Sequence, residues 1–360
     1  MFVIISILIF GLLVAIHELG HFIAAKAFGV GVPEFAIGMG PKLLKKQGKE
    51  TLYSLRAIPL GGFCAMDGDD NDTSGEKSLF SKPLWQRIVI FVSGSFMNLL
   101  AGVLIVLVLT GMMTALPGTT ITGFAEGFPL EGEQGFLEGD TIHSIDGARV
   151  FLNQNIGLLL DLSPEDVVDV VVIRDGARIT LSNLPLERRM YPGSDFPRYG
   201  IDLNINEAPT VGDRLIHTWN ATRDIVRQLP LTIRMFARGQ AGLEDMHSMV
   251  GIVDVMNQVG SAAPNMREAA IRLATLAAFI SISVAIFNLL PIPAVDGGRI
   301  FLMLISWGAL KIFGKPLNPK YERYINAVGF VLLIGFMVFI MFQDIVQIVT
   351  RETAVDYYNY

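Results

Sequence analysis

The sequence predicts a membrane protein with four transmembrane α-helices, a β-hairpin element and an extracytoplasmic β-rich domain. Three observations support this fold class. First, 51% of the 360 residues are hydrophobic and only 17% are charged, which is more apolar than is usual for a soluble protein. Second, four apolar stretches approach or exceed the roughly 20 residues that cross a bilayer. Third, alternating segments with glycine-containing turns lie between these stretches.

The four predicted spans carry almost no charge. The first contains the motif HELGH, and we expect it to be retained rather than cleaved, because a basic n-region and a small-residue cleavage site are lacking. The third carries two prolines near its end. The spans cover residues 1–25, 88–116, 273–295 and 325–343.

Lysine and arginine are concentrated in two connections, one between the first and second spans and one between the third and fourth. Positive charge favours the cytoplasmic side of a membrane. We therefore expect both connections to be cytoplasmic, and both termini and the segment 117–270 to be extracytoplasmic.

Strand-like segments are predicted in two places. In the first connection, EFAIGMGPKLL and ETLYSLRAIPLGGF are joined by a turn at 47–49, and the polar loop DGDDNDTSGEK follows. In the external segment, Asp146-Gly147 and Asp175-Gly176 each separate two short strands, as in tight hairpins. An amphipathic helix at 211–238 is also expected, resting either on the membrane surface or on the β-rich domain.

These elements divide the chain into nine segments. They are the first transmembrane helix (1–28), a cytoplasmic or membrane-associated β element with its loop (29–85), the second transmembrane helix (86–116), the β-rich domain (117–188), an extracytoplasmic linker with the amphipathic helix (189–270), the third transmembrane helix (271–298), a cytoplasmic loop (299–322), the fourth transmembrane helix (323–350) and an extracytoplasmic tail (351–360).

Composition also argues against several functions. The net charge is −6 and no long basic run is present, so a nucleic-acid partner is not expected. Cys64 is the sole cysteine, which excludes an intrachain disulfide and a cysteine-based zinc site.

The motif HELGH places His17, Glu18 and His21 in an apolar run, where ionisable side chains are unfavourable by a few kcal/mol each. Helical residues four apart share one face, so the two imidazoles suit a single zinc ion. The glutamate between them suits the base that hydrolysis needs. The alternatives are a chance match and histidines that only hydrogen-bond between helices.

A catalytic zinc ion needs a third protein ligand, and Asp296 is the best candidate. It ends the third span in NLLPIPAVDGGR, where Pro291 and Pro293 block helical continuation. Irregular backbone at membrane depth is tolerated only inside protein or beside a wet cavity. Asn288, in the same stretch, can donate to and accept from a peptide backbone. The alternative is a helix end at which Asp296 pairs with Arg299.

HELGH and NLLPIPAVDGGR together resemble the two signatures of the site-2 protease family of intramembrane zinc metalloproteases. The elements GMGPKLL, PLGGF and GD, and the four spans with one external domain, are similar to the bacterial RseP-type branch. GFLEGDTIHSIDGARV resembles the core of bacterial PDZ domains, so the β-rich domain at 117–188 is expected to be PDZ-like. The resemblance covers nearly the whole chain.

The resemblance implies a role for each residue of the first motif and for the aspartate of the second. His17, His21 and Asp296 would bind Zn²⁺, and Glu18 would be the general base. The enzyme would hydrolyse peptide bonds within transmembrane segments of single-span proteins, as in regulated intramembrane proteolysis. It would lie in a bacterial plasma (inner) membrane, in contact with membrane lipid.

The resemblance also implies how a substrate is held. Asn288, with the break at Pro291 and Pro293, would help to hold the substrate backbone, and the hairpin around 35–63 would be a membrane-associated element that receives the substrate as an added strand. The PDZ-like domain would bind a substrate tail, or admit only substrates already cut by another protease.

Two substitutions depart from the family pattern. Met249, in HSMVGIVDV, stands where the family often has proline, and Val295 stands where leucine usually precedes Asp-Gly. These positions bear on substrate gating and leave the zinc ligands unchanged. The competing function is a non-proteolytic zinc-binding scaffold or transporter with a PDZ-like recruitment domain. It is disfavoured because neither ligation nor transport requires Glu18 between the histidines.

Overall fold

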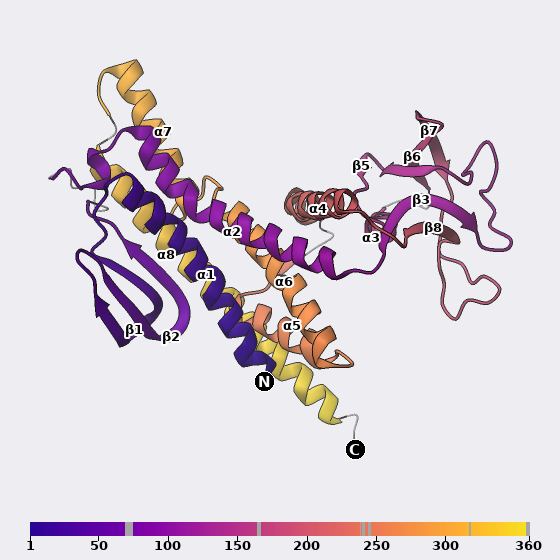
Figure 1. Ribbon diagram of the computed structural model, residues 1–360, viewed down its shortest axis with the longest axis horizontal. Helices are drawn as coiled ribbons and strands as arrows, with labels where there is room; N and C mark the ends of the chain where they lie inside the picture. Colours follow the sequence, from indigo (N-terminus) through magenta and orange to yellow (C-terminus); the bar gives the residue numbers. More distant parts are fainter. Residues whose placement is uncertain are drawn as a thin grey trace. The chain divides into compact units, whose positions relative to one another are not determined.

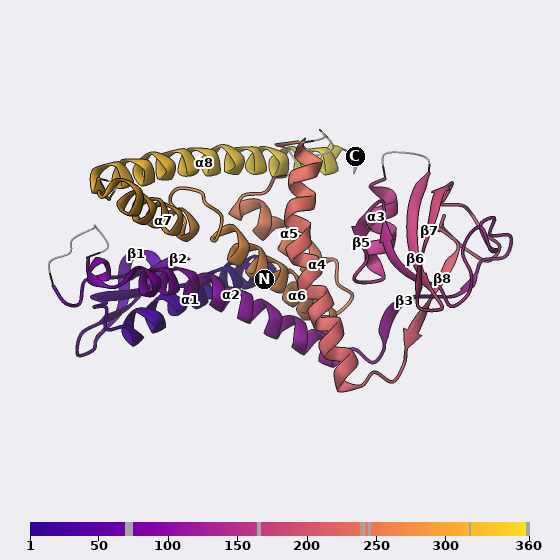
Figure 2. The same ribbon diagram turned by 90° about the horizontal axis from the view of Figure 1, so that it is seen from above.

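The computed structural model confirms a protein built from long apolar helices and two β-sheets (Figures 1 and 2). The chain divides into two compact units, one made of Met1–Ile105 with Gln228–Tyr360 and the other of Val106–Arg227. The residues that the structure describes are 1–68, 75–163, 167–237, 239, 242–243, 246–316 and 318–357. Residues 69–74 of the predicted polar loop and the last three residues of the predicted tail therefore lie outside the described residues.

Four helices in the described part of the chain are long and apolar enough to cross a membrane, which agrees with the four predicted spans. The protein is accordingly a multi-pass membrane protein. The first three are α1 (Phe2–Ala27), α2 (Leu84–Met112) and α6 (Met266–Phe287), and the fourth is the segment Arg323–Thr350 of α8 (Pro319–Tyr357). Helix α2 begins and ends four residues before the predicted span, because Leu116 already starts strand β3.

Two further helices occupy segments that the sequence predicts to be connections. Helix α7 (Asp296–Phe313) lies in the predicted cytoplasmic loop, and α5 (Met249–Ser261) lies in the predicted extracytoplasmic linker. Asp296 in the first turn of α7 and Lys311 in its last turn both complement the helix dipole. The Asp344 carboxylate of α8 accepts hydrogen bonds from the Ser248 and Gly251 amides at the start of α5.

The predicted hairpin is confirmed as strands β1 (Glu34–Gln47) and β2 (Leu52–Ala65). Both strands bend, so they form more than one pairing. Residues 42–47 run antiparallel to 52–56, and residues 34–37 run parallel to 52–55 and antiparallel to 62–65. The segment 62–65 is therefore an edge, to which no other strand among the described residues is paired. Phe22 of α1 packs on this sheet at Phe35, with ring centroids 5.2 Å apart.

The second unit contains a six-stranded sheet in the order β7-β6-β4-β3-β8, with the short strand β5 paired to β4. Its elements are β3 (Leu116–Phe124), β4 (Thr141–Ile145), β5 (Ala148–Arg149), helix α3 (Gln154–Asp161), β6 (Val168–Arg174), β7 (Ala177–Leu184) and β8 (Ile201–Asn206). Both predicted turns are confirmed, with positive φ at Asp146 and Asp175 and at the glycine after each. Strand β8 pairs with β3, so the sheet extends past the predicted boundary at residue 188.

The predicted amphipathic helix is α4 (Val211–Ala237). Its polar side packs on the β-rich domain, because Asn155 Nδ2 donates to the buried Asp224 carboxylate at 2.9 Å and the Arg223 guanidinium lies over the Phe151 ring. Its apolar side stays exposed, with Trp219 at 61%. The structure thus supports packing on the domain through the polar side and leaves the apolar side uncovered.

Candidate metal centre

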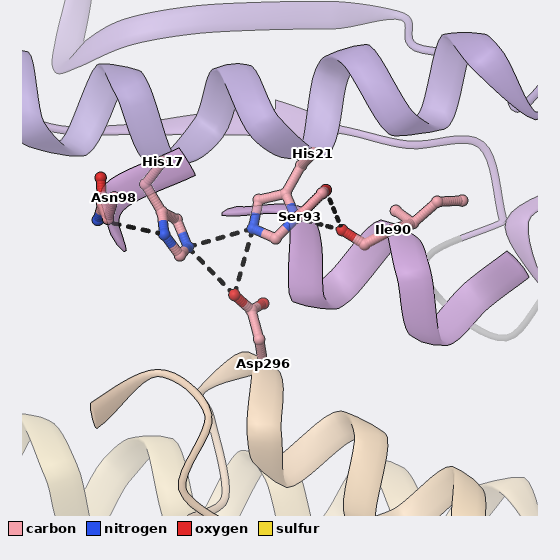
Figure 3. Close-up of polar contacts among 6 residues, drawn as sticks. All are labelled: His17, His21, Ile90, Ser93, Asn98 and Asp296. Carbon is pink, nitrogen blue, oxygen red and sulfur yellow. Dashed lines mark hydrogen bonds and ion pairs between the residues drawn. The ribbon is translucent and has the colours of Figure 1, made fainter. Parts of the chain in front are cut away.

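The two histidines of HELGH and the distant Asp296 meet at one point in the first unit. His17 and His21 lie one turn apart on α1 and are only 8% and 5% exposed. His17 Nε2 is 3.1 Å from His21 Nε2. Asp296 Oδ2 is 3.1 Å from His17 Nε2 and 3.2 Å from His21 Nε2 (Figure 3). Within the part of the chain that the structure describes, no other three His, Cys, Asp or Glu residues form such a group.

A break in the backbone after α6 brings Asp296 to the histidines. Helix α6 ends at Phe287, and the chain doubles back so that the Gly297 amide donates to the Asn288 carbonyl at 2.7 Å. A side chain at Gly297 would not fit, because its Cβ would lie 2.3 Å from the Leu290 carbonyl oxygen. The prolines at 291 and 293 prevent helical continuation, so α7 starts anew with Asp296 as its first residue.

Two glycines allow α1 and α2 to approach each other at the histidines. A Cβ at Gly20 would lie 2.2 Å from the Ser93 carbonyl oxygen, and a Cβ at Gly94 would lie 2.4 Å from His21 Nε2. Any larger residue at position 94 would occupy the space of the imidazoles. The centre therefore depends on a close helix crossing, which small residues permit inside membrane proteins.

The ring of His21 is oriented by α2. Its Nδ1 lies 2.8 Å from the Ile90 carbonyl oxygen, which also accepts from Ser93 Oγ (Figure 3). A carbonyl oxygen only accepts, so His21 Nδ1 carries the hydrogen and Nε2 of the neutral ring keeps its lone pair. That lone pair is directed at the meeting point with His17 and Asp296.

The three converging atoms fit a zinc ion. Three acceptors held about 3 Å apart repel one another unless a cation or a proton lies between them. Zinc binds imidazole nitrogen and carboxylate oxygen at roughly 2.0–2.2 Å, so tetrahedral ligand atoms lie about 3.3 Å from one another. The observed spacings of 3.1–3.2 Å are close to this value. Two histidines and one carboxylate are also a known ligand set of catalytic zinc.

The metal centre forms one wall of a cavity of about 370 Å³. Glu18 lines this cavity, and its carboxylate accepts a hydrogen bond from the backbone amide of Cys64 in the edge segment 62–65. Glu18 is therefore held between α1 and the edge of the β1–β2 sheet. The cavity is lined by Val14, His17, Glu18, His21, Phe63, Cys64, Met66, Phe91, Asn98, Val284, Asn288, Ala294, Val295, Asp296 and Arg299.

Of the three candidate substrate-binding residues, only Asn288 lies at the cavity. Asn288 lines the cavity, whereas Pro291 and Pro293 are not among its lining residues. Pro293 lies in the returning loop, against Gly329 of α8. The Arg299 guanidinium, the candidate partner of Asp296 in the alternative interpretation, lies over the Phe91 ring at 5.4 Å from its centroid.

Sequence reasoning missed the contribution of α2. Asn98 lies 3.5 Å from His17 Nδ1 and is fully buried. One signal pointed to it, because Asn98 is the sole amide side chain in the uncharged second span and follows Gly94 by one helical turn. The carbonyl of Ile90 had no such signal, because every residue carries one.

Comparisons with known proteins identify a matching family and several similar sequences. The sequence profile of peptidase family M50 matches residues 5–336. A Clostridium perfringens protein whose name describes a candidate zinc metalloprotease is 35% identical over 349 residues, covering 96% of this chain and 99% of that protein. The regulator of sigma-W protease RasP of Bacillus subtilis is 28% identical, covering 95% and 98% of the two chains. The metalloprotease MmpA of Caulobacter vibrioides is 27% identical, covering 94% and 93%.

Proposed function

Because the chain belongs to peptidase family M50, we propose that it is a zinc-dependent endopeptidase that cleaves peptide bonds in transmembrane segments of membrane proteins. One observation carries the proposal. His17 Nε2, His21 Nε2 and Asp296 Oδ2 converge within 3.1–3.2 Å, and Glu18 lines the same cavity. His17, Glu18 and His21 lie on α1, which is apolar enough to cross a membrane, and Asp296 begins α7 after the loop that follows α6.

His17, His21 and Asp296 would hold Zn²⁺. When bound, the metal supplies Lewis-acid polarisation of the scissile carbonyl and lowers the pKa of water. Glu18 removes a proton from the attacking water and returns it to the nitrogen of the leaving amine. The Cys64 amide, which donates to the Glu18 carboxylate, keeps the base at the cavity wall during both transfers.

A helical substrate has to unwind before cleavage, because its carbonyls are occupied by bonds within the helix. The unwound substrate strand would bind at the edge segment 62–65. Phe63 and Cys64 line the cavity, and no strand among the described residues covers their outer edge. An extended peptide that pairs there would lie beside Glu18. Asn288, on the α6 side of the cavity, would contact the same peptide.

The remaining parts of the molecule would select substrates. We assign the domain of β3 to β8 as PDZ-like, on the extracytoplasmic side of a bacterial inner membrane, where it receives a substrate tail or screens substrates by size. The name of the Bacillus relative links it to control of sigma-W, which supports a membrane-protein substrate in a signalling pathway. The exposed apolar side of α4 would rest on the membrane surface.

The test uses purified full-length chain in liposomes with a panel of single-span substrates. Wild type should cut them within the span, and Glu18→Gln should lose at least a factor of about 10²–10⁴ in rate, because general acid–base catalysis has that magnitude. Zinc content should be the same in both proteins. If wild type binds zinc but cuts no substrate of the panel, a zinc-binding scaffold or transporter replaces this proposal.

A further inference from the structure

We infer that Asn98 is a positioning residue of the metal centre, which holds the His17 ring in the tautomer that binds zinc through Nε2. This inference rests on the proposed function, because it assumes that His17 is a zinc ligand. It assigns a part of the centre to α2, a helix that supplies no ligand.

The two histidines need equivalent support on their second nitrogen. A histidine that binds metal through Nε2 must carry its hydrogen on Nδ1, and this hydrogen is almost always donated to a nearby acceptor. For His21 the acceptor is the Ile90 carbonyl oxygen at 2.8 Å. For His17, the Asn98 amide is 3.5 Å from Nδ1 (Figure 3).

The orientation of the Asn98 amide leaves one polar atom without a partner. Asn98 is 0% exposed, and its Oδ1 makes no hydrogen bond, while Nδ2 faces His17 Nδ1. The oxygen and nitrogen of an amide exchange places when the group rotates by half a turn. After that rotation, Oδ1 accepts from His17 Nδ1–H, and His17 Nε2 keeps the lone pair that the metal requires. The NH₂ group then takes the former place of the buried oxygen.

The backbone around Asn98 is built to hold this side chain against α1. Gly94 and Gly102 precede and follow it by one turn, and neither position has room for a Cβ: the first meets His21, and the second meets Ile282 of α6 at 2.5 Å. The Asn98 carbonyl oxygen accepts from Ser281 Oγ of α6 at 2.7 Å. Asn98 thus lies where α1, α2 and α6 meet, and the two glycines let its side chain approach α1.

A purely structural role does not explain an amide at this position. Burying an amide without a partner is unfavourable in a protein core, and Leu, of similar size, would fill the same space. An amide or a carboxylate can accept a hydrogen bond from His17 Nδ1–H, whereas an alkyl group cannot.

The test is the affinity of the purified full-length protein for zinc, measured by competition with a chelator and without any substrate. Loss of an outer-shell partner typically lowers metal affinity by about 10–100-fold, and we expect this loss in Asn98→Leu. Asn98→Asp should restore an affinity close to wild type, because a carboxylate also accepts from Nδ1–H. Ser281→Ala is the matched control, since it removes the hydrogen bond to the Asn98 backbone and leaves the side chain in place.

A second readout is the visible spectrum of the cobalt-substituted protein. We expect Asn98→Leu to change this spectrum, and Asn98→Asp and Ser281→Ala to retain the wild-type bands. If Asn98→Leu does not fold, Asn98→Ser, whose side chain is too short to reach His17, takes its place in both measurements.

The outcomes separate this inference from the proposed function. Zinc affinity in Asn98→Leu or Asn98→Ser equal to that of wild type overturns the role of Asn98 and leaves the protease proposal intact. A wild type that binds no zinc, or one whose binding survives His17→Ala, overturns both.

Discussion

At the scale of single residues, the centre depends on where side chains are absent as much as on where they are present. Gly94 faces the two imidazoles, and a Cβ there would lie 2.4 Å from His21 Nε2 and 2.8 Å from His17 Cε1. The His21 ring cannot move away freely, because its Nδ1 donates to the Ile90 carbonyl oxygen. A methyl group added on α2 would therefore act directly on the proposed zinc ligands.

We expect Gly94→Ala to lose zinc and proteolysis together, and to be destabilised by about 1–3 kcal/mol, the usual effect of overpacking. Gly111→Ala, in the same helix, is the control, because nothing lies within 4 Å of its Cβ position. Zinc content and thermal unfolding of the two variants check this prediction. Normal zinc binding by Gly94→Ala would show that α1 and α2 do not cross as closely as described.

At the scale of elements, the β1–β2 sheet is held by an ion cluster on its polar face. Glu34 accepts from Ser54 Oγ at 2.7 Å, Arg56 Nη2 at 2.9 Å and Lys42 Nζ at 3.0 Å. Partial burial acts to raise the pKa of Glu34, but these three donors outweigh it and lower the pKa to about 2. The cluster joins the segment 34–37 to residues of the hairpin 42–56.

This shift predicts how the sheet responds to acid. A carboxyl group with a depressed pKa contributes its full stability above the unfolded value, about 4.3–4.5, and loses it as pH falls toward 2. Hydrogen exchange of the β1–β2 amides, corrected for intrinsic rates, should therefore become less protected between pH 4.5 and 2. Glu34→Gln should lack this part of the pH dependence. Equal pH profiles for both proteins would contradict the role of the cluster.

The elements also show what could be predicted from sequence and what could not. The spacing of His17 and His21 fixes one helical face, and the prolines before Asp296 indicate a break, so the proposed ligand set could be predicted from local sequence. Helix α7 was missed because its uncharged run, residues 300–310, is about 16 Å long as a helix and cannot cross a bilayer alone. Strand β8 was missed because its partner β3 is about 80 residues away in the chain.

Asn98 shows the limit of such reasoning within the site. An isolated amide in an apolar span is visible in the sequence, but its partner is set by how α1 and α2 cross, which depends on contacts between distant glycines and backbone carbonyls. Spacing along one helix carries no information on that crossing.

At the scale of the whole molecule, the proposed orientation places the active site and the β-rich domain in different compartments. The charge of the two connections predicts that both lie on the cytoplasmic side and that residues 117–270 lie on the other side. In this proposed orientation, substrate selection would occur outside, and water would reach the HELGH end of α1 from the cytoplasmic side.

Cysteine labelling in spheroplasts checks this orientation. Cys64 is the only cysteine in the sequence and is buried. In a Cys64→Ser background, an impermeant maleimide therefore reacts only with newly introduced cysteines. Ser182→Cys, exposed on β7, should react in spheroplasts, and Lys315→Cys, exposed between α7 and α8, should react only after permeabilisation. The opposite pattern would reverse the assignment of sides.

The central claim is that an aspartate from the start of α7 and two histidines from α1 hold the same zinc ion. The most direct measurement is the zinc content of metal-stripped protein after dialysis with one equivalent of Zn²⁺. We expect one zinc per chain in wild type and in Asp344→Asn, a change at another buried aspartate, and none in Asp296→Ala. One zinc per chain in Asp296→Ala, held as tightly as in wild type, would contradict the account.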